Sequence, residues 1–357
     1  GLSRMHTPLT LAFWGSIHAA LGEFDVSIES ERLSFVLIEK YDLNSIRGTT
    51  IIINLAFNHF WRKKFDSDSR QNFLLAYRLA MSYGNITIAQ LGFSLWVLSA
   101  IFLDVQISDI HQVVRNVVNE MRDFDLKSGL ILLLPVWQIL LNLSGDVFNH
   151  DPSQLRGEAL DESFASSIHI MDSKLASLSL LTMESILFDV FDEIEQIGNN
   201  LSVITRHRNE TKGHFVMGFI QTWLAIFHYE SYIITGRRMH RRLARRSHRM
   251  VQYWSKTGTE MLCGPNCLLD AMEQLCMCKS SSKDLIICFE DAAKGCIISN
   301  SCLFEALAYE RLAKLLRKCD PPESGRYSIY QKQAVTVYRK WGAIAKAEHL
   351  EHTFLKV

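Results

Sequence analysis

The sequence predicts an all-α protein in which antiparallel helix pairs stack as a right-handed α-solenoid like that of tetratricopeptide (TPR) repeats. Apolar residues recur at helical spacing along nearly the whole chain, and no segment alternates polar and apolar residues long enough to indicate a strand. Turn residues divide the helical segments into pairs with a spacing of about 40 residues, as in helical repeat proteins. The length of 357 residues exceeds that of an ordinary compact domain, a limit that a solenoid avoids because each unit contacts only its neighbours.

The composition narrows the class of protein. The chain carries 38 basic and 38 acidic side chains, so its net charge is zero, which excludes nucleic-acid binding that depends on overall positive charge. Hydrophobic residues make up 48% of the chain, and there are only 18 glycines and 6 prolines. This composition is typical of a folded, helix-rich protein and excludes a largely disordered one.

Residues 1–145 are predicted to form an N-terminal TPR-like helical array of three antiparallel pairs and the start of a fourth. Short links such as Gly22–Asp25 favour antiparallel packing of the helices that they join. The segment 146–167 is polar and rich in turn-forming residues, which predicts a long loop or a break between two arrays. The expected helices of the first array are Pro8–Leu21, Val26–Tyr41, Ile46–Trp61, Ser67–Tyr83, Ile86–Leu103, Ile107–Phe124 and Leu126–Leu143.

Residues 168–357 are predicted to form a C-terminal TPR-like array, which brings the expected total to about fourteen to sixteen helices. Alanines and large aromatic residues at helical spacing in its last pair predict close packing of rings into alanine gaps. The run Gly198-Asn199-Asn200 is expected to end the second helix of this array. The expected helices are Ile168–Leu181, Thr182–Ile197, Gly213–Thr235, Arg237–Thr257, Leu268–Cys278, Lys283–Ile298, Leu303–Leu316 and Tyr327–Leu350.

One stretch raises the question of a membrane. Ile86–Leu103 has no formal charge and approaches the minimum length of a membrane span, although it contains Gln90, Ser94 and Ser99. A helix buried between neighbouring helices has the same pattern, and we favour that interpretation over the alternative of a polytopic membrane protein. No secretory signal pattern precedes residue 30, which predicts a cytoplasmic location with reduced thiols.

All eight cysteines lie between Cys263 and Cys319. Cys263-Gly-Pro-Asn-Cys267 and Cys276-Met-Cys278 could supply four zinc thiolates, but neither spacing is typical of structural zinc sites, and no histidine lies in this region. On a helix, Cys276 and Cys278 point about 200° apart. We therefore expect buried free thiols, with no metal and no cofactor.

Motifs of catalysis do not occur in the sequence. No serine stands in Gly-x-Ser-x-Gly, and no histidine pair has the His-Glu-x-x-His spacing of zinc peptidases. We therefore predict no catalytic residue and do not expect this segment to be an enzyme. An acidic stripe has the pattern of a solvated helix face and consists of Asp189, Asp192, Glu193 and Glu195.

A run of seven arginines is the candidate partner-binding site. On one helix, their side chains would span about half of the circumference. The residues predicted to face the core on the other side are Met239, Leu243, Met250 and Trp254. The predicted partner-binding residues are Arg237, Arg238, Arg241, Arg242, Arg245, Arg246 and Arg249.

Three interpretations of these arginines are open. They bind an acidic protein partner or a neighbouring domain of the same chain. They bind phosphate groups of a nucleic acid or of an anionic membrane. They form a solvated outer face that the acidic stripe partly neutralises. We expect protein partners or neighbouring domains, no nucleic acid and no membrane, while the oligomeric state is left open.

The closing segment resembles a known type of repeat unit. It contains the patterns Ala306-Leu-Ala-x-Glu310 and Ala334-x-x-x-Tyr338-x-x-Trp341-Gly-Ala-x-Ala345-Lys346, and its structural signature is Ala308, Ala334, Tyr338, Trp341, Gly342 and Ala343. These patterns resemble the terminal unit of the TPR-like region in hybrid signalling proteins that join a serine/threonine-kinase-like domain, an AAA-type ATPase, a GAF sensor and a histidine kinase. Further stretches similar to that region are Leu21–Asp25, His59–Trp61, Gln154–Glu158, and Trp254 with Pro265-Asn266.

The resemblance implies a function without a catalytic site. It implies a non-catalytic protein-interaction and signal-coupling scaffold, whose full-length parent would carry ATPase and sensor histidine kinase domains. The Gly-x-x-x-x-Gly-Lys-Ser/Thr phosphate loop and the kinase His-Arg-Asp motif of such domains do not occur in this chain. A free-standing TPR-like adaptor that binds an acidic partner through the Arg237–Arg249 helix is the alternative.

Overall fold

The protein is all-helical in the part of the chain that the computed structural model describes. The described residues form sixteen α-helices and contain no strand. The helices pack in neighbouring pairs, so the predicted all-α, solenoid-like class is confirmed, whereas the right-handed superhelix stays a prediction. The described residues are 4–61, 67–102, 105–124, 126–146, 151–161, 174–277, 282–319 and 325–355.

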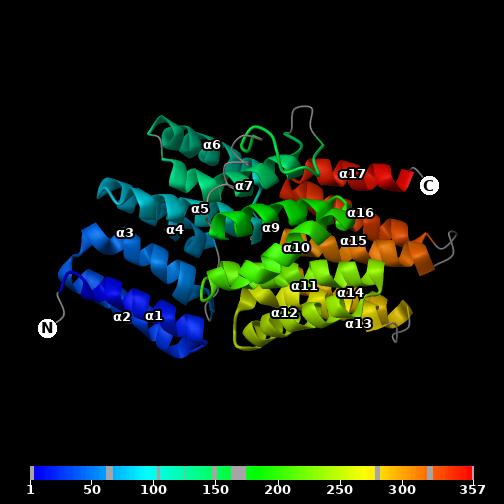
Figure 1. Ribbon diagram of the computed structural model, residues 1–357, viewed down its shortest axis with the longest axis horizontal. Helices are drawn as coiled ribbons and strands as arrows, with labels where there is room; N and C mark the ends of the chain where they lie inside the picture. Colours follow the sequence, from blue (N-terminus) through cyan, green and yellow to red (C-terminus); the bar gives the residue numbers. More distant parts are fainter. Residues whose placement is uncertain are drawn as a thin grey trace.

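The first seven helices form one stack, which rises from α1 and α2 at one end to α6 and α7 (Figure 1). Glycines close several of them, as expected, because a left-handed residue satisfies the last carbonyls: Gly22, with φ of 86°, follows the first helix. The helices of this stack are α1 (Thr7–Leu21), α2 (Phe24–Tyr41), α3 (Asn44–Ile53), α4 (Ser67–Ser82), α5 (Ile86–Phe102), α6 (Ile107–Asp123) and α7 (Lys127–Ser144).

The third helix ends earlier than expected. Its chain continues as a π-helical stretch over 54–58 and a 3-10 turn over 59–61. The buried amide of Asn58 donates to the carbonyl oxygen of Ala12 at 3.2 Å and to the side-chain oxygen of Asn54 at 2.7 Å. These hydrogen bonds tie the π-helical stretch to α1 at the point where the regular α-helical pitch is lost.

The remaining helices form a second stack, which descends from α9 to α12 and α13 and returns with α17 beside α7 (Figure 1). Short 3-10 turns at Arg208–Thr211 and Glu260–Leu262 join some of them. The helices of this stack are α9 (Lys174–Val190), α10 (Ile194–His207), α11 (Val216–Thr235), α12 (Arg238–Lys256), α13 (Cys263–Met277), α14 (Ser282–Ile298), α15 (Cys302–Cys319), α16 (Arg326–Trp341) and α17 (Ile344–Leu355).

Several helix boundaries of this stack differ from the prediction, and the expected boundary between Leu181 and Thr182 lies inside α9. The turn after α9 lies at Asp192, which has a φ of 67°, and Gly198-Asn199-Asn200 lie inside α10 instead of ending a helix. The expected helix 327–350 is two helices, because Gly342 adopts a φ of 92° and ends α16. The N–H of the following residue donates back to the carbonyl of Tyr338 at 2.9 Å, a typical glycine C-terminal cap.

One hydrophobic core runs through both stacks. The indole N–H of Trp61 donates to the carbonyl of Gly213 at 2.9 Å, and the hydroxyl of Thr259 donates to the carbonyl of Trp61 at 2.8 Å. Residues 151–161 of the expected break form turns, and Gln138 of α7 accepts two of their backbone N–H groups. Residues 147–150 and 162–167 of that segment lie outside the described residues, and the division into two arrays stays a prediction.

Length and apolarity of the helices bear on the membrane question. None of the helices in the described ranges is both long and apolar enough to cross a membrane. The apolar stretch that raised the question forms α5, which has 17 residues. It lies among α4, α7 and α3, and the side chains of Trp96, Val97 and Ile101 belong to the core.

Candidate functional site

The helix that carries the arginine run, α12, packs between α11 and α13. Its buried residues are spaced at intervals of three and four, and they are Ala244, Ser247, His248, Val251 and Trp254. The prediction that Met239 faces the core is wrong, because this side chain is 54% exposed, and Leu243 and Met250 are only half-buried. The small residues among the buried set allow a close approach to α11, which turns the buried face about 90° from the predicted one.

The arginines of the run have three kinds of surroundings. Arg237 precedes the helix in an extended conformation. Arg245 pairs with Glu273 of α13 at 2.5 Å, and the guanidinium of Arg241 lies 5.7 Å from the centre of the Tyr232 ring. The other four side chains are exposed and form no ion pair with any described residue. We call these four the arginine face: Arg238, Arg242, Arg246 and Arg249.

A further cation lies close to the arginine face. Arg208, in the turn after α10, is half-buried. Its pKa is lowered because burial disfavours the charged form and because Arg246 repels it. Arg208 therefore adds to the positive charge of this surface.

The acidic stripe does not neutralise the arginine run, so that part of the prediction is wrong. Asp189 is fully buried at the end of α9, and its carboxylate accepts a hydrogen bond from Arg311 of α15 at 2.6 Å. Asp192, in the turn that follows α9, pairs with Lys314, which also lies on α15. Because the stripe spans a turn between two helices, its residues do not share one solvated face.

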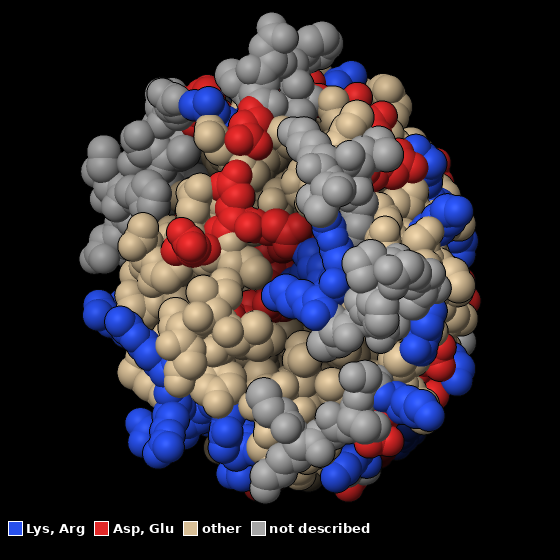
Figure 2. Space-filling view, turned by 90° about the vertical axis from the view of Figure 1, so that its right-hand side faces the viewer, with Lys and Arg blue, Asp and Glu red and all other residues tan. Residues whose placement is uncertain are grey.

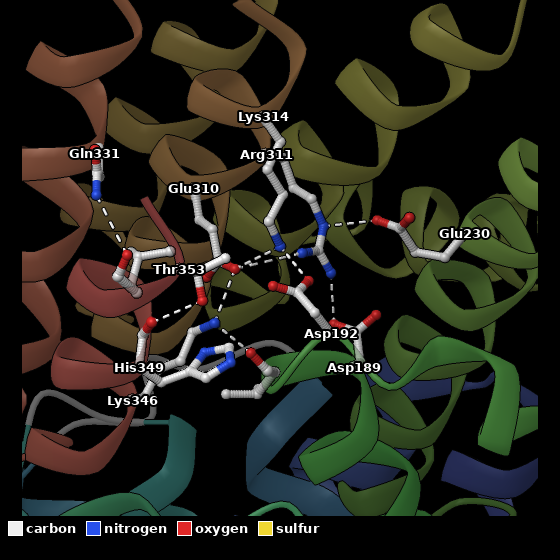
Figure 3. A network of polar contacts seen from close by, with 12 residues as sticks. Asp189, Asp192, Glu230, Glu310, Arg311, Lys314, Gln331, Lys346, His349 and Thr353 are labelled. Atoms are coloured by element: carbon white, nitrogen blue, oxygen red, sulfur yellow. Dashed lines mark hydrogen bonds and ion pairs between the residues drawn. The ribbon is translucent and has the colours of Figure 1, made fainter. Parts of the chain in front are cut away.

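These carboxylates belong to a buried network of charges that we call the ion network (Figure 3). Glu310 of α15 lies at its centre and accepts hydrogen bonds from Lys314 at 2.6 Å and from Lys346 of α17 at 2.9 Å. The hydroxyl of Tyr338 on α16 donates to the other oxygen of the same carboxylate at 2.8 Å. The charged members of the ion network are Asp189, Asp192, Glu230, Glu310, Arg311, Lys314 and Lys346.

Arg311 joins three helices within the ion network. Its guanidinium contacts Asp189 of α9 and Glu230 of α11, each at 2.6 Å, and is itself only 7% exposed (Figure 3). Lys346 extends the connection to α17, since its ammonium also donates to the carbonyl of Val190. Five helices of the second stack thus meet at one set of buried charges.

Burial and pairing shift the titration of these groups in opposite directions. Burial raises the pKa of Asp189 to about 6, although Arg311 acts against it. Burial also acts to raise the pKa of Glu310, but Lys314, Lys346 and the guanidinium beside it outweigh this effect and hold the pKa well below its usual range. Glu310 is therefore ionised at neutral pH, and Asp189 is the carboxyl of the ion network that protonates most readily.

The ion network reaches the surface at one edge. The side chains of Asp192 and Lys314 are only partly buried, whereas Glu310 is fully buried. On the end of the molecule shown in Figure 2, acidic and basic side chains meet around a hollow near the middle of the view. Because these charges are mostly buried and are paired with one another, they leave no open position for a substrate among the described residues. We therefore assign them a structural role.

Two of the signature residues of the closing segment contribute to the ion network. Tyr338 is a member through its hydroxyl, and Gly342 ends α16 so that α17 can bring Lys346 to Glu310. The sequence indicated packing for these positions and did not reveal the charges that meet there. A signal existed, because Glu310, Arg311 and Lys314 lie within five residues in the middle of α15, among apolar residues. The remaining signature residues are all buried: Ala308, Ala334, Trp341 and Ala343.

The cysteines form no metal site within the described ranges, where no three His, Cys, Asp or Glu residues are placed to hold an ion. Cys276 is buried beside the carbonyl of Tyr229, and Cys263 and Cys267 are half-buried near the start of α13. Burial raises the pKa of the Cys267 thiol, so it is protonated at neutral pH. Cys278, which the sequence analysis paired with Cys276, lies outside the described residues.

Comparison with models of known protein families, with curated proteins and with solved structures gives no match to this chain. The arginine face offers unpaired donors to a partner, and the ion network joins helices. Of the two, the arginine face is the candidate binding site.

Proposed function

We propose that the chain is a non-enzymatic protein-binding scaffold whose arginine face takes an acidic segment of a partner protein or of a neighbouring domain. One observation carries this proposal. The buried cations of α15 and α17 each have carboxylate partners, whereas the four cations of the arginine face have none among the described residues. Exposed arginines that repel one another and lack partners are better explained by binding than by stability.

The spacing of the arginine face fits a helical or extended acidic segment. Arg238, Arg242 and Arg246 follow one another at intervals of four residues, which places successive guanidinium groups roughly 6 Å apart along the helix axis. Arginine binds carboxylates through two parallel hydrogen bonds, so each position can hold one glutamate or aspartate in a defined orientation. Arg208 strengthens the same field without occupying the face.

The contacts of α12 support a role in coupling. Arg245 and His248 of α12 face Glu273 of α13, and the ring of His248 also contacts the hydroxyl of Tyr229 on α11 at 3.0 Å. The next residue of α11, Glu230, is a member of the ion network. A partner that shifts α12 would therefore act on helices that lead to α15 and α17.

Charge reversal tests the proposal directly. The probe is a fluorescent peptide of about 20 residues with glutamates at every fourth position, and its binding is followed by fluorescence anisotropy. The double substitution Arg242→Glu/Arg246→Glu should weaken binding by a factor of about 10 or more, and added salt should weaken binding to the wild type. The peptide with glutamine at the same positions is the control ligand.

A matched variant separates the arginine face from net charge. Arg78 on α4 and Arg122 on α6 are exposed arginines far from α12 in the sequence. The double substitution Arg78→Glu/Arg122→Glu changes the net charge equally and should leave binding within a factor of about two. Equal loss of binding in both double variants would show that only the overall charge matters, and the proposed function would be wrong.

We further propose that the scaffold is a cytoplasmic, signal-coupling segment of a larger hybrid signalling protein. The support is the resemblance of the segment 306–346 to the terminal unit of the TPR-like region in such proteins. The reading frame on both sides of the chain tests this. An AAA-type phosphate loop before it and a GAF or histidine kinase domain after it are expected, and unrelated flanking sequence would leave a free-standing adaptor.

A further inference from the structure

A cavity of about 230 Å³ lies where the two stacks of helices meet. Its walls come from α5 and α7 of the first stack, from α9 of the second, and from the link that leads into α11. α5 packs on α7 and α7 packs on α9, so the three helices lie side by side around it (Figure 1). The proposed arginine face takes no part in this cavity.

The interior of the cavity is apolar. Leu91, Leu95 and Leu98 of α5 and Leu132 and Val136 of α7 supply much of its surface. Of the three hydroxyl groups that line the cavity, those of Ser94 and Thr211 donate to backbone carbonyls of their own turns. An engineered apolar cavity of about 150 Å³ holds benzene, so this one has room for on the order of eight to ten carbon atoms.

The mouth of the cavity carries an unused positive charge. Lys212 is exposed and forms no ion pair with the residues that the structure describes. The one carboxylate that the described residues place at the mouth, that of Glu210, already lies 3.7 Å from Lys174 and 3.9 Å from His207. The charge that remains available to a ligand is therefore positive.

A neutral histidine at the mouth adds a hydrogen-bond donor. The Nδ1 atom of His214 accepts the backbone N–H of Val216 at 3.1 Å, which assigns the ring proton to Nε2. Burial lowers the pKa of His214 to about 3, so the ring is uncharged at neutral pH. Its ring packs edge-on against Phe57, which also lines the cavity, and this contact fixes the orientation of the donor.

We propose that this cavity binds a medium-chain monocarboxylic acid. The apolar chain fills the space between α5, α7 and α9, where burial of each methylene group is favourable. The carboxylate stays at the mouth, where it pairs with the ammonium group of Lys212 and accepts a hydrogen bond from Nε2 of His214. An amine of the same length would bind less well, because the carboxylate of Glu210 at the mouth is already paired.

Three probes of equal chain length test the ligand class on the full chain. Decanoate, decanol and decylamine are each titrated below their micelle concentrations, and binding is measured by calorimetry. Decanoate should bind saturably at one site, and decanol should bind more weakly by a factor of about five or more. Decylamine should be the weakest ligand. No saturable binding of decanoate, or binding at many equivalent sites, overturns the proposal.

Substitutions at the mouth test the position of the site. Lys212→Met should weaken the binding of decanoate at least about five-fold and change the binding of decanol less than about two-fold. Lys256→Met on α12 is the control, and it should change the binding of neither ligand. Ser179→Trp or Leu175→Trp places an indole in the cavity and should abolish the binding of both decanoate and decanol. Because Leu175 is 41% exposed, its substitution does not disturb the core. The assignment is overturned if the folded tryptophan variants still bind decanoate, or if Lys212→Met leaves the affinity for decanoate unchanged.

Discussion

The basic residues of α15 and those of α12 have opposite surroundings. On α15, the guanidinium of Arg311 lies between two buried carboxylates, and the ammonium of Lys314 lies between two others. On α12, the arginine face extends into solvent with no carboxylate partner among the described residues. Arg311 and Lys314 of α15 join helices, and the arginine face of α12 keeps its hydrogen-bonding capacity for another molecule.

Burial explains this difference. A charge inside a protein is tolerated only when a counter-charge and hydrogen bonds replace its hydration, whereas a charge in water needs neither. The ion network contains three cations and four carboxylates, so one negative charge is in excess. The raised pKa of Asp189 identifies the carboxyl at which this excess is most easily relieved, by protonation.

Removing the central cation of α15 should have the largest effect. Arg311→Met leaves Asp189 and Glu230 buried without their cation and should lower the free energy of unfolding by about 3–5 kcal/mol. Urea denaturation measures this change. Arg32→Met on α2 removes an arginine that is paired with Glu29 but exposed, and it should lower stability far less, because solvent screens an exposed pair. Similar losses in the two variants would contradict the contrast between buried and exposed cations.

The hydroxyl of Tyr338 should contribute less than the guanidinium. Tyr338→Phe removes one hydrogen bond to the ionised Glu310, which keeps its two ammonium partners, and should lower the free energy of unfolding by about 1.5–3 kcal/mol. Tyr41→Phe on α2 is the control, because that residue is exposed, and it should change stability by less than about 0.5 kcal/mol. A loss below that value for Tyr338→Phe would show that the hydroxyl is not needed in the ion network.

The sequence predicted most helices because their apolar periodicity is local information. The boundaries of α1, α5 and α6 lie within two residues of the expected ones. The turn at Asp192 had no such signal, since a non-glycine residue adopts the left-handed conformation there. The stripe was therefore interpreted as one solvated face.

The ion network could not be predicted for the same physical reason. The partner of Asp189 is Arg311, which lies 122 residues further along the chain, and no local pattern records that contact. The arginine run was visible at once because its charges are consecutive on one helix. Which of these arginines lack a carboxylate partner depends on how α12 is oriented against its neighbouring helices. The small residues Ala244 and Ser247 set this orientation only in the packed structure.

The protonation of Asp189 should make stability depend on pH. Its pKa is about 6 in the folded protein and near 3.8 when unfolded, so between these values the folded state holds a proton that the unfolded state has lost. The free energy of unfolding should therefore fall as pH rises from about 4 to 6, by about 1–2 kcal/mol relative to Asp189→Asn. Glu310, whose pKa is lowered from 4.5, acts in the opposite direction and mainly below about pH 5, and its contribution cancels in the comparison with Asp189→Asn. Parallel stability curves for the wild type and Asp189→Asn between these pH values would contradict the assignment.

Relief of repulsion on the arginine face should change stability least, and in the opposite direction. Arg242→Gln on the arginine face removes repulsion from Arg238 and Arg246, each four residues away, and should raise the free energy of unfolding by about 0.2–0.5 kcal/mol for each pair relieved. The gain should disappear at high salt, which screens exposed charges but not buried ones. Denaturation of the wild type and the variant at about 0.02 M and 0.5 M salt measures both effects. A loss of stability that persists at high salt would mean that this arginine, like Arg311, already serves the fold, and that it is not held free for a partner.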